Sequence, residues 1–404
     1  MWGTAAFYVF CMSTIFMVFF STSAIQVWPR PWNQLSILTA CFLPVILVLV
    51  WKLPEWISAR QFKKELLFVP LISILGMLNI VFSENRAVTL KVMAIFLLTG
   101  IFVFGITNVL MTTKQRQQIF LYLSWVCLVA FCIYGTIEYI NQKSIFLLSF
   151  NPIPAGSLLI LLFAGPFLLF HTASNRLRIL LFASVVAGIA VIIIIGKQGP
   201  VLGLLGMVFF GVMMMPKKKL VWIILIIALI MTGIGYKMRK HLPSTLTRVL
   251  SGSTSLLYRM ENYPLAAHII QKKPVFGIGL HSPLISYLND YKPKIVNDEN
   301  YIEYVKQTKT FENIILCGFV EMGTLFTLSY LALIIYLLSK LFFHIKHNPE
   351  KKMHAVLLLS PLFGFLVHSM TFDSLIYPHL NWLFHSYLGI MANFEVYANK
   401  SINA

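Results

Sequence analysis

Three charged residues stand where they could act on an anionic substrate. Lys197 interrupts a long apolar run and is followed by Gly199 and Pro200, so the next helix would begin beside it. A cation next to the N–H groups of a helix start suits phosphate. Arg259, in STSLLYRMENYPLAAHIIQ, carries a planar fork that can hold two phosphate oxygens. Glu312, in TKTFENIILCGFVEMGTLF, could accept a hydroxyl proton at a helix start.

Each of these residues also has a structural explanation. A lysine at the end of a membrane span can snorkel to the interface, and a carboxylate at a helix start can serve the helix dipole alone. An arginine on an external loop needs no function. Two further residues are candidates for substrate binding. Arg86, in SENRAVTLK, could bind an anionic glycan. His281, after GIGL, could line the outer mouth of the helix bundle.

The remaining acidic residues do not suggest a second reactive centre. Glu321 follows Glu312 by nine residues, so the two carboxylates do not share a helix face and form no paired-carboxylate site. A glutamate inside an apolar helix is expected to be paired structurally. Asp373 lies near His368 and His379, but their spacing matches no metal-ligand pattern. No metal and no cofactor are therefore expected.

The composition places these residues in a membrane protein. Of the 404 residues, 58% are hydrophobic and only 11% are charged, which is typical of a polytopic membrane protein rather than a soluble one. The net charge of +18 does not indicate nucleic-acid binding, because the Lys and Arg residues lie in short clusters between apolar runs. The cysteines are expected to be small core residues: Cys11, Cys41, Cys127, Cys132 and Cys317.

The apolar runs predict an all-α polytopic membrane protein with about 12 transmembrane helices and one large extracytoplasmic loop domain. Residues 1–236 would form transmembrane helices 1–9, residues 237–312 the loop domain, and residues 313–404 transmembrane helices 10–12 with a cytoplasmic tail. The first run is long enough to span and stay, so no cleavable signal is expected. The runs lie at about 4–27, 33–51, 66–82, 88–111, 119–140, 146–170, 179–196, 200–215, 220–236, 313–339, 355–371 and 380–394.

The distribution of basic residues predicts the orientation. With both termini in the cytoplasm, the inner loops and the tail hold sixteen Lys and Arg, whereas the short outer loops hold five. The segment 237–312 carries eleven more on the outer side, but a segment of that length can cross regardless of its charge. It should fold as a helical external unit that closes with a Pro-Gly turn in KKPVFGIGL.

Taken together, these motifs resemble those of a known superfamily. A short outer turn carries a cation, Lys197, and the external segment has Arg259 with an aromatic residue, Tyr263, four positions later. A P-x-x-G-I-G turn follows at 274–279, and the re-entry helix begins with Asn313 and continues to an E-x-G motif. This pattern resembles the O-antigen ligase and Wzy-type polysaccharide polymerase superfamily, bacterial enzymes of the cytoplasmic (inner) membrane. Its members move a glycan from an undecaprenyl-pyrophosphate carrier onto an acceptor sugar at the outer face.

The sequence departs from this family at two positions. Members commonly have arginine where this chain has Lys197, so the charge is kept but the fork is lost. The ligases have His-Asn at the start of the re-entry helix, where this chain has Glu312-Asn313. The resemblance therefore favours polymerisation of repeat units over ligation onto lipid A core. Ligation to lipid A core or another acceptor remains the alternative, and the Gram type of the host stays open.

The resemblance implies a metal-independent, inverting displacement at the anomeric carbon, without a cofactor. Lys197 and Arg259 would neutralise the pyrophosphate leaving group, and Glu312 would take the proton of the acceptor hydroxyl. The implied partners are the undecaprenyl-pyrophosphate-linked glycan donor, a glycan acceptor, membrane lipids and, as a further candidate, a chain-length regulator, with no nucleic acid. The predicted substrate-binding residues are Asn313 and Tyr263, which match the family motifs, together with Arg86 and His281, which are candidates from their own positions.

Two other classes of function compete with this one. A lipid-linked oligosaccharide transporter or flippase would carry charges in mid-membrane positions and internal repeats, and neither is visible in the sequence. A non-catalytic membrane scaffold or sensor would tolerate substitution at Lys197, Arg259 and Glu312. Charge clustered at the outer face favours the enzyme.

Overall fold

The computed structural model describes residues 2–27, 63–142, 145, 152–170, 172–214, 254–288, 291–296, 299–308 and 311–398. Within these ranges every regular element is a helix, which confirms the all-α class. The predicted spans at 33–51 and 220–236 and the first part of the loop domain, 237–253, lie outside the described residues.

Seven helical segments are long and apolar enough to cross a membrane, by length and composition, within the described ranges. Six of them correspond to predicted runs, five almost end to end and the run at 146–170 from residue 152 onward. For the remaining runs, the prediction of a membrane span rests on the sequence. The seven segments are Lys64–Phe82 (the short η1, Lys64–Leu67, and α3, Phe68–Phe82), Arg86–Leu110 (α4, Arg86–Phe96, the π-helical turn η2, Leu97–Ile101, and α5, Phe102–Leu110), α6 (Lys114–Gln142), Pro152–Leu169 (α7, Pro152–Leu162, and α8, Ala164–Leu169), α9 (Asn175–Ile195), α17 (Thr324–His347) and Lys351–Ser369 within α18 (Pro349–Ser369). Two shorter apolar helices accompany them, Gly3–Phe19 within α1 (Trp2–Val27) and α10 (Gln198–Met214).

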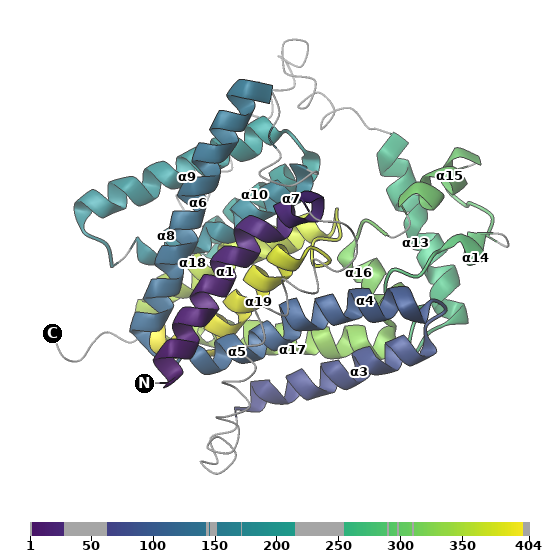
Figure 1. Ribbon diagram of the computed structural model, residues 1–404, viewed down its shortest axis with the longest axis horizontal. Coiled ribbons are helices and arrows are strands. Elements are labelled where there is room, and N and C mark those ends of the chain that lie inside the picture. The colour runs from purple at the N-terminus through teal and green to yellow at the C-terminus, as the bar shows by residue number, and fades with distance from the viewer. Residues whose placement is uncertain are drawn as a thin grey trace.

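Helix α19, Pro378–Ala392, runs through the middle of the bundle and is buried from His379 to Ala392 (Figure 1). Its polar side chains bond to neighbouring helices: Asn381 Nδ2 donates to Thr99 Oγ1 at 2.9 Å, and Trp382 Nε1 donates to Thr14 Oγ1 at 3.0 Å. In an apolar surround such bonds between helices stabilise one arrangement, because an unpaired polar group there is costly.

Glycines bring α10 and α18 together. A Cβ atom on Gly203 would lie 2.8 Å from the carbonyl oxygen of Gly364, and one on Gly206 would lie 2.9 Å from Val367. Only hydrogen at these positions allows the two backbones to approach this closely. The start of α10, and with it Lys197, is therefore fixed against the end of α18.

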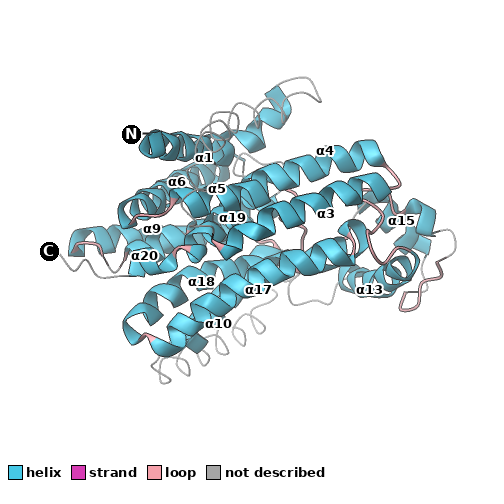
Figure 2. Cartoon of the chain, turned by 90° about the horizontal axis from the view of Figure 1, so that it is seen from below, coloured by secondary structure: helices cyan, strands magenta, loops and turns pink. Residues whose placement is uncertain are grey.

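Three helices outside the bundle, called the external helices for that position alone, gather at one end of it beside the α3–α4 turn, whereas α20 (Phe394–Ala398) and the start of α1 lie at the other end (Figures 1 and 2). These external helices are α13 (Thr254–Lys272), α14 (Ile285–Leu288) and α15 (Glu299–Thr308). They share a separate apolar core that includes Leu265, Ile269, Tyr301 and Phe311. The helix predicted within STSLLYRMENYPLAAHIIQ is confirmed as α13.

The predicted re-entry span at 313–339 is not one helix, so this prediction was wrong. The short helix α16 (Ile314–Cys317) and the π-helical turn η3 (Gly318–Met322) end at Gly323, and α17 begins after it. Gly323 has a φ of 84°, and a Cβ atom there would lie 2.4 Å from the carbonyl oxygen of Val275. The chain turns at this glycine because the external segment packs directly against it.

Candidate active site

The P-x-x-G-I-G turn fastens the external helices to the bundle. The N–H groups of Ile278 and Gly279 donate to the carbonyl oxygens of Val320 and Glu321 at 3.0 and 2.9 Å. Gly279 has a φ of 102°, and a Cβ atom there would lie 1.9 Å from Ser83 Oγ. A side chain at this position would meet both backbone strain and a steric clash.

The end of α3 holds this turn from the other side. The side-chain amide of Asn79 donates to the carbonyl oxygens of Phe276 and Glu321 at 2.6 and 2.8 Å. Just beyond α3, the N–H of Glu84 donates to the carbonyl oxygen of Ile278 at 3.0 Å, and its carboxylate accepts a hydrogen bond from the Tyr287 hydroxyl. The turn is thus bonded to α3 and to η3 together.

Arg259 and Glu312 form an ion pair at the start of α16. Both Nε and Nη2 of Arg259 lie 2.9 Å from Oε2 of Glu312, and the two side chains are 29% and 26% exposed. The Tyr304 hydroxyl donates to the same oxygen at 3.2 Å. Within the described residues, Oε1 of Glu312 has no hydrogen-bond partner. The pair is therefore open to solvent on one side and has an oxygen available for a further donor.

Tyr304 supports this pair as a proton donor. Burial, together with the neighbouring Glu312 carboxylate, raises the pKa of Tyr304 to about 12, although Arg259 acts in the opposite direction. The phenol therefore stays protonated at neutral pH and donates to Glu312. This contact could not be found from the sequence, because no periodic pattern connects α15 to the start of α16.

Asn313 anchors the start of α16 and connects it to two other elements. Its side-chain oxygen accepts from the N–H groups of Ile315 and Leu316 at 2.9 and 3.2 Å. Its amide nitrogen donates to the carbonyl oxygen of Met370 at 3.0 Å and lies 3.4 Å from the Tyr263 hydroxyl. Asn313 and Tyr263 are thus brought next to Glu312 and Arg259, as the sequence predicted for one site.

Lys197 lies on the turn between α9 and α10, which packs against the end of α18. Gly196 ends α9 with a φ of 63°, and α10 begins directly after Lys197. A Cβ atom on Gly199 would lie 2.9 Å from Thr371 Oγ1 and 3.1 Å from His368 Nε2. The lysine side chain is exposed and has no hydrogen bond or ion pair with the described residues. The Lys197 turn and Asn313 therefore both contact the chain at 368–371, where α18 ends, whereas no contact joins Lys197 to Arg259 or Glu312 within the described residues.

The other two predicted binding residues are placed differently. The N–H of His281, at a φ of 60°, donates to Oε2 of the buried Glu321 at 2.8 Å. Burial lowers the pKa of His281, so its ring is neutral at pH 7. Its role here is to pair Glu321, as expected for a glutamate in an apolar helix. Arg86 is the first residue of α4 and is exposed, and no described residue bonds its side chain.

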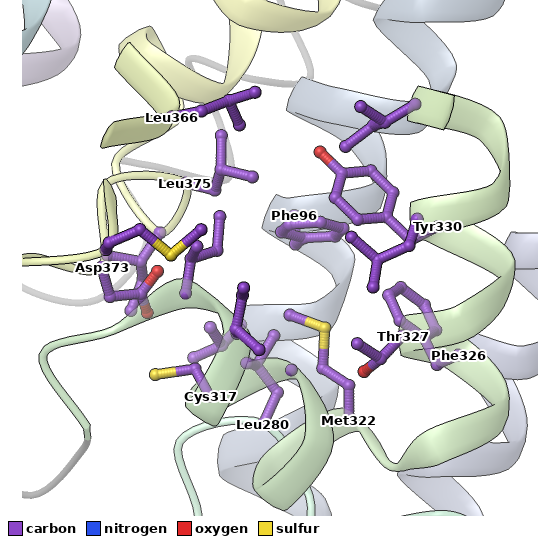
Figure 3. A pocket seen from close by; sticks show the side chains of 18 residues that line it. Phe96, Leu280, Cys317, Met322, Phe326, Thr327, Tyr330, Leu366, Asp373 and Leu375 are labelled. Carbon is purple, nitrogen blue, oxygen red and sulfur yellow. The ribbon is translucent and has the colours of Figure 1, made fainter. Parts of the chain in front are cut away.

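An apolar cavity of about 160 Å³ lies against α16 (Figure 3). Its walls come from α4, α16, α17 and the turn after α18, with Phe96, Phe326 and Tyr330 on one side. Asp373 is the charged residue among the lining side chains and lies across the cavity from Tyr330 in Figure 3. Burial raises the pKa of Asp373 to about 6, although the Cys317 thiol favours the charged form.

Asp373 is a feature that the sequence did not single out for chemistry. Its spacing to the two nearby histidines, His368 and His379, matched no metal pattern. Within the described residues no group of three His, Cys, Asp or Glu side chains is placed to hold a metal ion. The His368 ring instead bonds to the hydroxyls of Ser157 and Ser374 at 3.1 and 2.9 Å. Asp373 alone faces the cavity.

The comparisons with known proteins agree with the motifs. A family model described as O-antigen ligase matches residues 183–325, a little over a third of the chain. The matched segment contains Lys197, Arg259 and Glu312. No curated protein matches the chain.

The match, together with the apolar helices, indicates an integral membrane protein of the O-antigen ligase or polymerase type, a glycosyltransferase-like enzyme that acts on lipid-linked glycans. The matched segment begins within α9 and ends in the first turn of α17, so it spans both the Lys197 turn and the external helices. The match confirms the resemblance that the motifs indicated, to the superfamily of O-antigen ligases and Wzy-type polysaccharide polymerases.

Proposed function

We propose that this chain polymerises undecaprenyl-pyrophosphate-linked glycan repeat units at the outer face of the bacterial cytoplasmic membrane. The observation that carries the proposal is the Arg259–Glu312 pair, in which a cation and a carboxylate with one unoccupied oxygen lie side by side. The pair joins α13 to the start of α16, and α13 lies at the end of the bundle opposite α20 and the start of α1 (Figure 2). The excess of basic residues in the other loops supports placing both termini in the cytoplasm.

In the reaction, the acceptor hydroxyl attacks the anomeric carbon of the donor sugar from the side opposite the phosphate. The new C–O bond forms as the bond to the pyrophosphate breaks, which inverts the anomeric configuration. The proton of the hydroxyl passes to Oε1 of Glu312, the oxygen that Arg259 and Tyr304 leave unoccupied. Undecaprenyl pyrophosphate leaves with the bonding electrons.

Arg259 and Lys197 would stabilise the charge that develops on the leaving pyrophosphate. Arg259 uses Nε and Nη2 for Glu312, and its side chain is 29% exposed, so the guanidinium could also meet a phosphate oxygen. Lys197, on the turn that packs against the end of α18, would supply a second charge. Two cations could neutralise the leaving group without a metal ion, and Tyr263, Asn313 and the exposed Arg86 would contact the sugars.

The apolar cavity that α16 helps to line suits the first part of the prenyl chain. A cavity of about 150 Å³ with apolar walls holds a ring the size of benzene. The cavity here, about 160 Å³, could therefore take one isoprene-sized group, and the rest of the chain would lie in the bilayer. Such an anchor would place the pyrophosphate beside α16 and the Arg259–Glu312 pair.

Polymerisation is favoured over ligation by one observation. Glu312, beside Asn313, stands at the position where the ligases have histidine. Asn313 itself caps the start of α16 by accepting hydrogen bonds from two backbone N–H groups. Ligation of lipid-linked glycan to lipid A core or another acceptor is the second candidate. A lipid-linked oligosaccharide flippase and a scaffold are the candidates outside the enzyme class.

The test is complementation of a host strain that lacks this gene. The wild-type chain should restore a ladder of glycan lengths, and Lys197→Ala and Arg259→Ala should each remove the ladder while the protein stays in the membrane. Lys306→Ala, an exposed lysine on α15 outside this site, is the matched control and should keep the ladder. A single transferred unit on lipid A core would indicate ligation, and full ladders from both variants would overturn the enzymatic proposal.

A further inference from the structure

A second pocket opens on a face of α13 other than the one that carries Arg259. It has a volume of about 340 Å³ and lies between α13, from Pro264 to Gln271, and the loop at 291–294. Helix residues that are three or four positions apart share a face, so Pro264, Ala267, His268 and Gln271 point together. Arg259 lies five residues before Pro264 and therefore faces elsewhere. The pocket is thus separate from the Arg259–Glu312 pair.

The pocket carries positive charge and hydrogen-bond donors. The side chains of Lys292 and Lys294 are exposed at its rim, and Gln271 adds an amide. The Nε2 atom of His268 is buried and has no hydrogen-bond partner among the described residues. No acidic side chain is among the lining residues. A buried ring nitrogen that can still take a hydrogen bond, in a pocket that two lysines also line, suits a polar or anionic ligand.

The loop that carries the lysines is held in place before any ligand binds. The N–H groups of Lys294 and Val296 donate to the buried carboxylate of Glu261 at 2.8 and 3.0 Å, and the N–H of Ile295 donates to the same carboxylate. The hydroxyl of Tyr291 also donates to Glu261. The negative charge of Glu261 is thus used within the protein and does not oppose an anion in the pocket. A site fixed in advance loses less entropy when its ligand binds.

Tyr291 also gives the pocket an aromatic wall. Its ring centroid lies 5.6 Å from that of His268, with the two rings tilted by 50°. An aromatic face beside polar donors suits the apolar face and the hydroxyl edge of a sugar ring. The two lysines suit a carboxylate or phosphate group on that sugar.

We infer that this pocket binds an anionic sugar residue of the glycan, one that bears a carboxylate or phosphate group. The inference rests on the proposed function for the origin of the glycan, but the binding itself does not require transfer. The pocket lies on the same helix as Arg259, so a bound sugar here would hold a longer glycan while its end reaches the Arg259–Glu312 pair. The chain would therefore select acidic over neutral glycans.

The experiment measures binding to the full-length protein in nanodiscs of neutral lipid, by isothermal titration calorimetry. The probes are two uronate tetrasaccharides, from hyaluronan and polygalacturonate, their carboxyl-reduced neutral forms, and inorganic phosphate. At least one uronate probe should bind, and its neutral form should bind at least about tenfold more weakly. Lys292→Gln or Lys294→Gln should weaken binding about threefold, and the double variant about tenfold. Lys294→Gln keeps the backbone N–H that bonds Glu261, so the loop should stay folded.

The controls separate this inference from the proposed function. Lys306→Gln removes an exposed lysine outside the pocket and should bind as the wild type does. Arg259→Ala should lose the glycan ladder but retain uronate binding. Equal binding of the acidic and neutral probes, equal affinity for phosphate alone, or no saturable binding of either uronate probe would overturn the inference, whatever the transfer assay shows.

Discussion

Arg259 and Glu312 meet on a single oxygen atom. Two nitrogens of the arginine lie 2.9 Å from Oε2, whereas Oε1 has no hydrogen-bond partner in the described part of the chain. With both side chains more than a quarter exposed, such a pair contributes at most about 1 kcal/mol to folding. The pair is therefore better explained by what it can do to a substrate than by stability.

Substitutions of Glu312 should separate proton transfer from charge pairing. Glu312→Gln keeps the size and one hydrogen-bond acceptor for Arg259 but cannot take a proton, so transfer should fall at least about 100-fold. Glu312→His restores a proton acceptor and should recover part of the loss. The measurement is glycan transfer by purified protein from a lipid-linked donor, with membrane insertion checked by gel filtration in detergent. Equal activity of the glutamine variant and the wild type would show that Glu312 is not the base.

Replacing Gly279 should disrupt the attachment of the external helices. Gly279→Ala places a methyl group 1.9 Å from Ser83 Oγ at a φ of 102°, and the expected loss of stability is more than about 3 kcal/mol. Gly105→Ala is the matched control, because its new methyl group meets only a Val69 methyl at 3.3 Å. Thermal unfolding in detergent should show a large decrease in Tm for Gly279→Ala. The decrease for Gly105→Ala should be small, because its expected loss of stability is about 1 kcal/mol or less. Similar Tm values for the two would contradict this account of the turn.

Asp373 should make stability depend on pH. Its folded-state pKa of about 6 is higher than its ordinary value of 3.8, so the folded protein binds the proton more tightly. Stability should therefore fall as pH rises from about 4 to above 6, by at most about 3 kcal/mol from this group. Asp373→Asn removes the free-energy cost of burying an ionised carboxylate and should therefore raise Tm at about pH 8. The difference in Tm between this variant and the wild type should shrink as pH falls to about 4. A Tm difference that does not change with pH would contradict the prediction.

Glu261 should control the loop that carries Lys292 and Lys294. Burial opposes its ionisation, but the hydrogen bonds from Tyr291 and three backbone N–H groups outweigh burial and lower the pKa of Glu261. The carboxylate therefore stabilises the fold above its ordinary pKa of 4.5, and this contribution is lost as pH falls through the lower folded-state value. Glu261→Gln should speed hydrogen exchange of the amides at 294–296, with the amides of α6 as an internal control. Unchanged exchange at 294–296 would show that the carboxylate does not hold the loop.

Much of the bundle could be predicted from apolar length alone. The runs at 66–82, 119–140 and 179–196 correspond to Lys64–Phe82, Lys114–Gln142 and Asn175–Ile195, because a helix in lipid needs a continuous apolar stretch. The run at 313–339 failed for a local reason. Its apolar character continues through Gly323, but the left-handed backbone of that glycine ends the helix where the external turn packs.

The candidate site was predictable only in part. Arg259, Tyr263, Glu312 and Asn313 lie close together, because the P-x-x-G-I-G turn returns the chain to the bundle between them, and their common role in a site stays a prediction. Tyr304 was missed, since its bond to Glu312 depends on how α15 packs and no sequence pattern reports that. Contacts between separate segments of this kind are set by tertiary packing, which a single sequence does not encode in any local period.

The start of α16 divides two duties between adjacent side chains. Asn313 fixes the backbone, with one amide oxygen on two N–H groups and its nitrogen on the Met370 carbonyl, while Glu312 has no part in those bonds. The side chain at position 312 can therefore be changed without shifting α16. A frame that tolerates glutamate or histidine in the same place would let one architecture serve acceptors of different acidity, with the choice of chemistry confined to a single codon.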